Sequence, residues 1–117
     1  MKRPAGNADG RVVTLRNETD GPDSRHLWAH VDQEGNLHID GQDLGPKTAI
    51  VSSDGEYEWF QKIKKSDIPK LVGLLGGGAE DDILDLLEEN WSGSRSADLE
   101  PLLRESDIKV ERFIWSG

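Results

Sequence analysis

Apolar and polar residues alternate with a period of two along four segments of the chain, which is typical of β-strands with one buried face. These segments are residues 11–19, 26–40, 56–64 and 108–115. The first places Val13 and Leu15 on one face and is followed by a predicted turn, "DGPDS". The second is long enough for two strands joined by a turn at "DQEGN". The alternation therefore predicts about five strands.

The hydrophobic period changes to that of amphipathic helices between residues 66 and 107. Apolar residues of the first helical segment recur at i, i+3, i+4 and i+7, as on one face of a helix. The three helical segments are residues 66–78, 79–91 and 96–107. Because strands come first, then helices, then a final strand, we expect an α+β fold. Its mainly antiparallel sheet of about five strands should have about three helices packed on one face.

The turn at residues 32–36 decides which hairpin residues share a face. Gly35 is well placed as the left-handed residue of a three-residue loop, a type I turn closed by a G1 bulge. In that register Val31 faces Leu37 and His30 faces His38, so one face is apolar and the other is mainly polar. A two-residue turn would pair Val31 with His38 and mix the two faces. We therefore expect the three-residue loop.

The remaining segments carry turn and linker residues. Residues 41–55, "GQDLGPKTAIVSSDG", predict a connection with one helical turn from Pro46. Residues 1–10, rich in Gly, Pro and small polar residues, predict a flexible N-terminal tail. At 117 residues the chain has the usual length of one domain, which we place at residues 11–117.

Four stretches of the chain carry a resemblance to known proteins. They are "DQEGNLHIDGQDLG", "YEWF", "DIPKLVGLLGG" and "ERFIWSG". With them the chain resembles a family of short bacterial proteins without an assigned biochemical role, over most of its length from residue 11 onward. The stretches consist of turn and core residues. The resemblance therefore implies a compact α+β domain and brings no active site with it.

Acidic residues outnumber basic ones by 23 to 14, which gives a formal charge of −9. Residues 79–117 hold eleven acidic and four basic side chains, so they carry −7 of this charge. Because binding to nucleic acids and to anionic membranes depends on Lys and Arg, we expect neither partner. The chain has no cysteine, which excludes disulfides and zinc–thiolate sites. No apolar run suits a signal peptide or a membrane span, so we expect a cytoplasmic protein.

The predicted hairpin holds all three histidines of the chain, His26, His30 and His38, on the face opposite the apolar one. Imidazole nitrogens bind zinc, nickel or copper, and Asp32 or Asp40 would add an oxygen ligand. The spacing matches no known metal motif, and one face of an antiparallel hairpin is usually solvated. We therefore expect solvated histidines, no structural metal and no cofactor. A metal site at the three histidines is the alternative.

Acidic residues form a stripe along the second helical segment. Asp81, Asp85 and Glu88 lie at i, i+4 and i+7. A charged stripe of this kind is usually a solvated helix face, and acidic residues near a helix N-terminus also stabilise the helix. The alternative is a docking surface for a basic partner, because the charge would speed the encounter.

Strand alternation places four aromatic residues on the face opposite the core: Trp28, Phe60, Phe113 and Trp115. A solvated sheet face rarely carries four large aromatic side chains. We therefore expect a second small core, a homodimer seam or a surface that binds a partner. The same alternation assigns Tyr57, Trp59 and Ile114 to the core. It also puts the polar Gln61 and Arg112 there, which a β-bulge would explain.

No nucleophile–base pair, phosphate-binding loop or other catalytic set is assembled along the sequence, which favours a protein that is not an enzyme. The first hypothesis is a small acidic protein-interaction domain. It would bind a protein partner, for example a basic toxin neutralised by an immunity protein or antitoxin, or it would self-associate. The second hypothesis is a small-molecule or metal-binding protein, or an enzyme, centred on the histidine-bearing hairpin.

Overall fold

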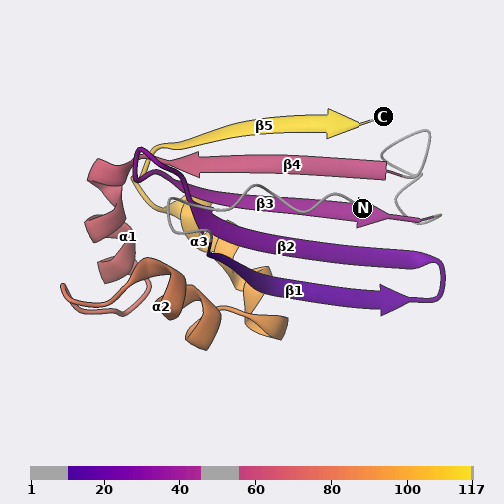
Figure 1. The fold of residues 1–117 in the computed structure, drawn as a ribbon, viewed down its shortest axis with the longest axis horizontal. Coiled ribbons are helices and arrows are strands. Elements are labelled where there is room, and N and C mark those ends of the chain that lie inside the picture. The colour runs from indigo at the N-terminus through magenta and orange to yellow at the C-terminus, as the bar shows by residue number, and fades with distance from the viewer. Residues whose placement is uncertain (1–10, 46–55, 117) are drawn as a thin grey trace.

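The computed structural model describes residues 11–45 and 56–116, and these residues contain five β-strands in one antiparallel sheet (Figure 1). The strands are β1 (Val12–Asp20), β2 (Asp23–Val31), β3 (Leu37–Leu44), β4 (Glu56–Ile63) and β5 (Val110–Ser116). Each strand pairs with its neighbours in the sequence, so the order across the sheet is β1-β2-β3-β4-β5. β1 and β5 are therefore the two edge strands.

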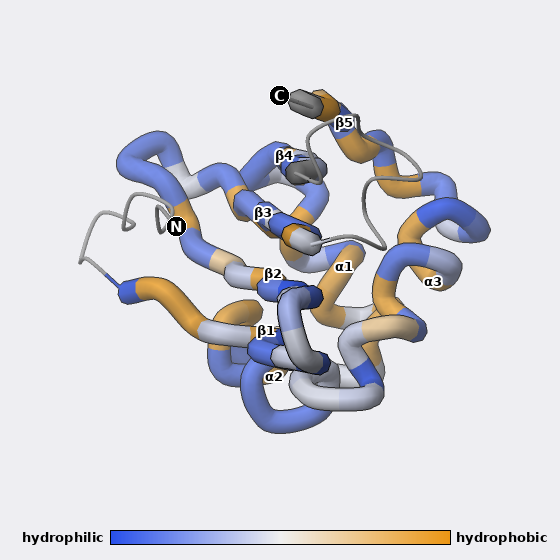
Figure 2. The backbone as a smooth tube through the Cα atoms, turned by 90° about the vertical axis from the view of Figure 1, so that its right-hand side faces the viewer, coloured by the Kyte–Doolittle hydropathy of each residue, from blue (hydrophilic) through white to orange (hydrophobic). Residues whose placement is uncertain are grey.

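Three α-helices lie between β4 and β5 in this part of the chain. They are α1 (Ile68–Leu74), α2 (Ile83–Asn90) and α3 (Leu99–Glu105), and the 3-10 helices η2 (Lys65–Asp67) and η3 (Gly93–Asp98) precede α1 and α3. Figure 2 looks along the strands and shows α1 and α3 on the same side of the sheet. The predicted α+β fold, an antiparallel sheet with three helices, is confirmed. We call the side of the sheet that faces the helices the inner face and the opposite side the outer face.

Two of the sequence predictions lie outside the described residues. These are the tail of residues 1–10 and the helical turn from Pro46. Within the described residues, no helix is long and apolar enough to cross a membrane.

The β2–β3 hairpin has the predicted three-residue loop. Gly35 has a φ of 88°, and its N–H donates to the Asp32 carbonyl oxygen at 3.0 Å. The Asp32 carboxylate accepts hydrogen bonds from the backbone N–H groups of Glu34 and Asn36, at 2.9 and 3.0 Å. Val31 consequently pairs with Leu37, and the predicted register is confirmed.

β3 is longer than the sequence indicated, because Gly41–Leu44 continue the strand instead of forming a connection. Gly41 pairs with Leu27 on β2 and with Trp59 on β4. A Cβ at Gly41 would overlap the six-membered ring of the Trp59 indole. Glycine at this position lets the indole lie directly against the strand. The sequence had instead predicted a turn here.

A β-bulge in β1 sets the position of Arg16. The register between β1 and β2 shifts between Thr14 and Arg16, so Leu15 is the extra residue and Arg16 pairs with Leu27. The bulge brings the Arg16 side chain to the inner face beside Leu27. Simple alternation would have placed Arg16 on the outer face.

The helices cover only part of the inner face. α2 lies against β1 and β2, and η3 lies against β1. The sheet residues of the core, such as Leu37, Ile39 and Ile63, are almost fully buried against helix residues such as Leu71 and Leu87. At the β5 edge the core is incomplete.

The predicted core position of Ile114 is wrong, because its side chain is 59% exposed. Tyr57 and Trp59 are likewise only partly buried. The helices in the described part of the chain cover this end of the inner face less fully than they cover β1 and β2.

Replacing Gly35 with valine should destabilise the fold by about 1–2 kcal/mol, because a β-branched residue disfavours a positive φ. The added Cβ would also meet the Lys65 side chain at 2.7 Å. Urea unfolding of both proteins measures the difference. Gly73→Ala is the matched control, because a Cβ at this helical position meets nothing within 4 Å and alanine favours a helix. Equal stability of the Gly35→Val variant and the parent would contradict the loop geometry.

Candidate functional site

The strand pairing places the four predicted aromatic positions on the outer face. Trp28 pairs with Asp40, Asp40 with Phe60, and Phe60 with Phe113, so these residues form one row across β2 to β5. Trp115 pairs with Glu58 in the next outer-face row. The alternation in the sequence was therefore sufficient to place these aromatic positions on one face.

Exposure divides Trp28, Phe60 and Phe113 into two groups, and the side chain of Trp115 lies outside the described part of the structure. Trp28 is only 5% exposed, and its ring stacks on His26 with centroids 5.6 Å apart. Phe60 is 36% exposed and Phe113 is 65% exposed, and their rings contact each other with centroids 6.1 Å apart. Trp28 therefore belongs to the interior, whereas the Phe60–Phe113 pair is open to a partner.

The expectation of solvated histidines is wrong for His30, which is buried near the hairpin end of the outer face. The His30 ring stacks on the His38 ring with centroids 4.8 Å apart and an interplanar angle of 5°. Burial lowers the pKa of His30, and the neighbouring His38 lowers it further, although Asp32 partly opposes both. His30 is therefore held in its neutral form near neutral pH.

His38 is tied to the turn of the hairpin. Its Nε2 lies 2.7 Å from Oδ2 of Asp32. Burial opposes the ionisation of Asp32, but hydrogen bonds from His38 and from the backbone of Asn36 and Glu34 outweigh it and lower the Asp32 pKa to about 2. The pair therefore stabilises the loop that sets the hairpin register.

The three histidines do not converge on one point. His30 Nδ1 lies 3.8 Å from Asp40 Oδ2, His38 is bonded to Asp32, and His26 stacks on Trp28. Within the described residues, no group of three or more His, Asp or Glu side chains is arranged to hold a metal ion. The geometry therefore gives the alternative metal site no support.

Asp40 is the buried carboxyl group of the outer face. Burial raises its pKa to about 6, and attraction to His38 only partly offsets this effect. Its Oδ1 and the buried Nδ1 of His30 have no hydrogen-bond partner among the residues that the structure describes. Buried polar atoms of this kind lower stability by about 1–3 kcal/mol each, so this part of the outer face is not optimised for stability.

The predicted acidic stripe has intramolecular roles. The Asp81 carboxylate accepts a hydrogen bond from the Gly78 N–H at 2.7 Å. Asp82, beside the stripe, caps α2 by accepting from the Asp85 N–H at 3.0 Å. Arg11 forms ion pairs with both Asp82 and Asp85, and lies 3.8 Å from Glu88. A basic partner at Asp85 and Glu88 would therefore have to displace Arg11.

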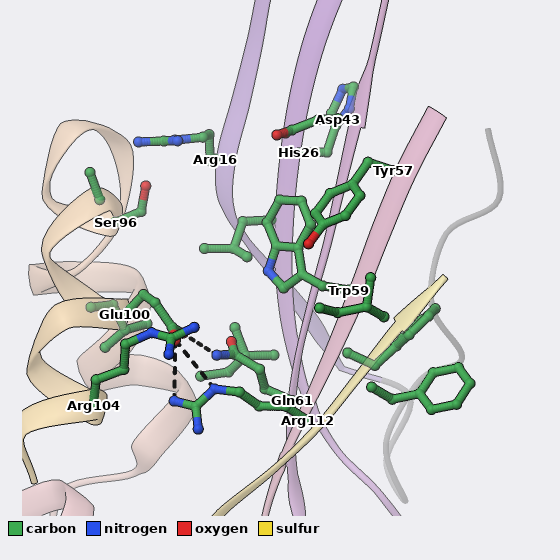
Figure 3. A pocket seen from close by; sticks show the side chains of 17 residues that line it. Arg16, His26, Asp43, Tyr57, Trp59, Gln61, Ser96, Glu100, Arg104 and Arg112 are labelled. Atoms are coloured by element: carbon green, nitrogen blue, oxygen red, sulfur yellow. Dashed lines mark hydrogen bonds and ion pairs between the residues drawn. The ribbon is translucent and has the colours of Figure 1, made fainter. Parts of the chain in front are cut away.

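The sequence did not reveal the groove on the inner face. A cavity of about 400 Å³ lies between β3–β5 and the segment η3–α3, and we call it the inner-face groove (Figure 3). Tyr57 and Trp59 lie in its middle, with ring centroids 5.7 Å apart. Leu99 and Ile114 add apolar surface from α3 and β5. The groove separates this part of the inner face from η3 and α3.

One end of the inner-face groove is a charged network around Glu100 (Figure 3). Oε1 of Glu100 accepts from Arg104 Nε at 2.7 Å and from Arg112 Nη2 at 3.1 Å. Oε2 accepts from the amide of the buried Gln61. The predicted bulge that would explain Gln61 and Arg112 is therefore wrong, because the β4–β5 pairing is continuous and both residues line the groove.

The other end of the inner-face groove carries Arg16 and Asp43, and it is also bordered by His26, whose ring stacks on Trp28 of the outer face (Figure 3). Arg16 Nε lies 3.1 Å from Oε1 of Glu18. Burial raises the pKa of Asp43, and the nearby Arg25 and Arg16 partly offset this effect. In the sequence, the polar residues Gln61 and Arg112 at inner-face positions indicated that this part of the face is not a closed apolar core.

Three comparisons with known proteins give no match: no family model fits the chain, and neither the curated proteins nor the solved structures include a match to it. The resemblance to short bacterial proteins therefore gains no support from them. The class of protein and its function rest on the fold and on the surfaces described above.

Replacing Asp40 with asparagine should change the pH dependence of stability. The raised pKa means that between about pH 4 and pH 6 the folded state keeps a proton that the unfolded chain releases. Stability should therefore fall through this window as pH rises, by about 3 kcal/mol for this group. Urea unfolding should show that Asp40→Asn is more stable than the parent at pH 7.5, by a margin that has become much smaller at pH 4.5. Equal stability at both pH values would show that the Asp40 pKa is not raised.

Proposed function

We propose that the protein is a small acidic protein-interaction domain that binds a protein partner through β4 and β5. The observation that supports it most is the exposed Phe60–Phe113 pair at the edge of the sheet, where Phe113 is 65% exposed. Aromatic residues are enriched among the side chains that contribute most binding energy at protein interfaces. A pair of contacting aromatic rings at an accessible edge therefore suits a protein partner.

The two edges of the sheet differ in a way that favours β5. The second half of β1, residues 17–20, is exposed and consists of polar and charged residues, and β1 carries a bulge. These features hinder the addition of another strand. The centre of β5 has no bulge and carries the apolar residues Phe113 and Ile114, which are exposed on opposite faces. A partner that adds a strand beside β5 would gain backbone hydrogen bonds and would bury both side chains.

The acidic surface has a secondary role in this proposal. Asp81 and Asp85 already form hydrogen bonds or ion pairs within the protein, so they are less available to a partner. The formal charge of −9 still favours a basic partner, because attraction over long range speeds the encounter. Neutralisation of a basic toxin by an immunity protein or antitoxin is one function of this kind.

Replacing Phe113 with serine should weaken partner binding by about tenfold or more, as the loss of a central interface aromatic does. Its stability should change little, because the side chain is mostly exposed in the free protein. Affinity capture from native lysate, quantified for the tagged parent and the variant, measures the effect.

Leu74→Ser is the matched control, because Leu74 is an exposed apolar residue on α1 and belongs to neither strand of the proposed surface. The proposal predicts a protein that the parent and Leu74→Ser capture equally and that Phe113→Ser loses. Equal capture by all three proteins would refute a binding surface at β5.

A further inference from the structure

We propose that the inner-face groove is a binding site for a small amphiphilic anion, with an apolar body against Trp59 and Tyr57 and an oxyanion group at the Arg104–Arg112 end. This site goes beyond the protein-interaction function. It lies mainly on the opposite face of the sheet, although Phe60, Phe113 and Ile114 of the proposed partner surface also border it. Its ligand class follows from the walls of the groove, from its charges and from its rigidity.

The middle of the groove fits an apolar body. Its volume of about 400 Å³ falls in the usual range for sites that bind small molecules, roughly 300–1,000 Å³. The walls are the aromatic rings of Tyr57 and Trp59 together with Leu99 and Ile114. Such walls stabilise an aromatic or aliphatic body by burying its surface.

The floor of the groove is fixed before any ligand binds. Gly41 has no Cβ, so the Trp59 indole lies directly against β3, and Trp59 also packs against the core. Leu99 is almost fully buried in the same core. A ligand would therefore not have to order these side chains, which lowers the entropic cost of binding.

The charged end of the groove favours an anion. Glu100 supplies one negative charge to the two positive charges of Arg104 and Arg112, so this end carries an excess of one positive charge in a protein of net charge −9. A cationic group would meet two guanidinium groups there.

The two guanidinium groups also keep donors for a second oxyanion. Arg104 contacts Glu100 through Nε, and Arg112 contacts it through Nε and Nη2. An arginine has five N–H donors, so each retains N–H groups that Glu100 does not use. Arginine pairs of this kind bind carboxylate, sulfonate and phosphate groups through charge-assisted hydrogen bonds.

The opposite end of the groove does not offer an equal anion site. Arg16 there is paired with Glu18, and Asp43 adds a second carboxyl group nearby. The positive charge of Arg16 is therefore offset within the protein. We consequently assign the oxyanion group to the Arg104–Arg112 end.

Titration of the full chain with 8-anilinonaphthalene-1-sulfonate, an aromatic anion whose fluorescence rises in apolar sites, tests the proposal. We expect saturable binding of one dye molecule per chain, displaced by decanoate and at least tenfold less effectively by decanol. Arg104→Gln and Arg112→Gln should each weaken dye and decanoate binding by about tenfold, the effect of losing a charge-assisted contact. Lys70→Gln, which removes the same charge from an exposed pair with Asp107, should leave binding unchanged.

A steric variant separates the groove from other apolar surface. Ala97 lies on the groove wall in η3, and Ala97→Trp should abolish dye binding by filling the space. Circular dichroism and urea unfolding establish that each variant is folded, and Arg104, which is 65% exposed, is the variant least able to perturb the fold. Absence of dye binding, equal displacement by decanol and decanoate, or unchanged binding in Ala97→Trp would each overturn the proposal. Unchanged binding in both arginine variants would also overturn it.

Discussion

The three-residue loop between Asp32 and Asn36 holds the register on which both faces of the sheet depend. Side chains alternate along a strand, so a slip of one residue in the hairpin would move every residue of β3 to the opposite face. Asp32 prevents this slip by binding the loop N–H groups and His38 at once, while Gly35 takes the positive φ that closes the loop. The assignment of every outer-face and inner-face residue of β3, β4 and β5 follows from this register.

The helices do not cover the whole inner face, and the proposed ligand site follows from that mismatch. α2 lies against β1 and β2 and η3 lies against β1, whereas at β4 and β5 a groove separates the sheet from α3. The outer face there exposes Phe113, and the inner face exposes Ile114 beside the groove. The incomplete helix cover therefore accounts for the exposed Ile114 and for the proposed ligand site, whereas Phe113 is exposed because it lies on the outer face near the sheet edge.

The fold could be predicted from the sequence because period and turn chemistry agree at most positions. The alternation located Phe60 and Phe113 on one face, and Gly35 fixed the hairpin. The sequence-based predictions failed where the role of a residue depends on a tertiary contact. Gly41 looked like a turn residue but accommodates the Trp59 indole, and Arg112 looked like an exception caused by a bulge but lines the groove. Neither contact leaves a local pattern, because each depends on a strand or helix distant in the chain.

Solvent paramagnetic relaxation enhancement, measured by nuclear magnetic resonance with a soluble nitroxide, tests most directly whether the β5 edge is open on both faces. We predict large enhancements for the side chains of Phe113 and Ile114, an intermediate one for Trp59 and small ones for Trp28 and Ile63. This order reflects the exposure of each side chain in the free protein. Enhancements at Phe113 and Ile114 as small as that at Ile63 would contradict the account, because both faces of β5 would then be covered.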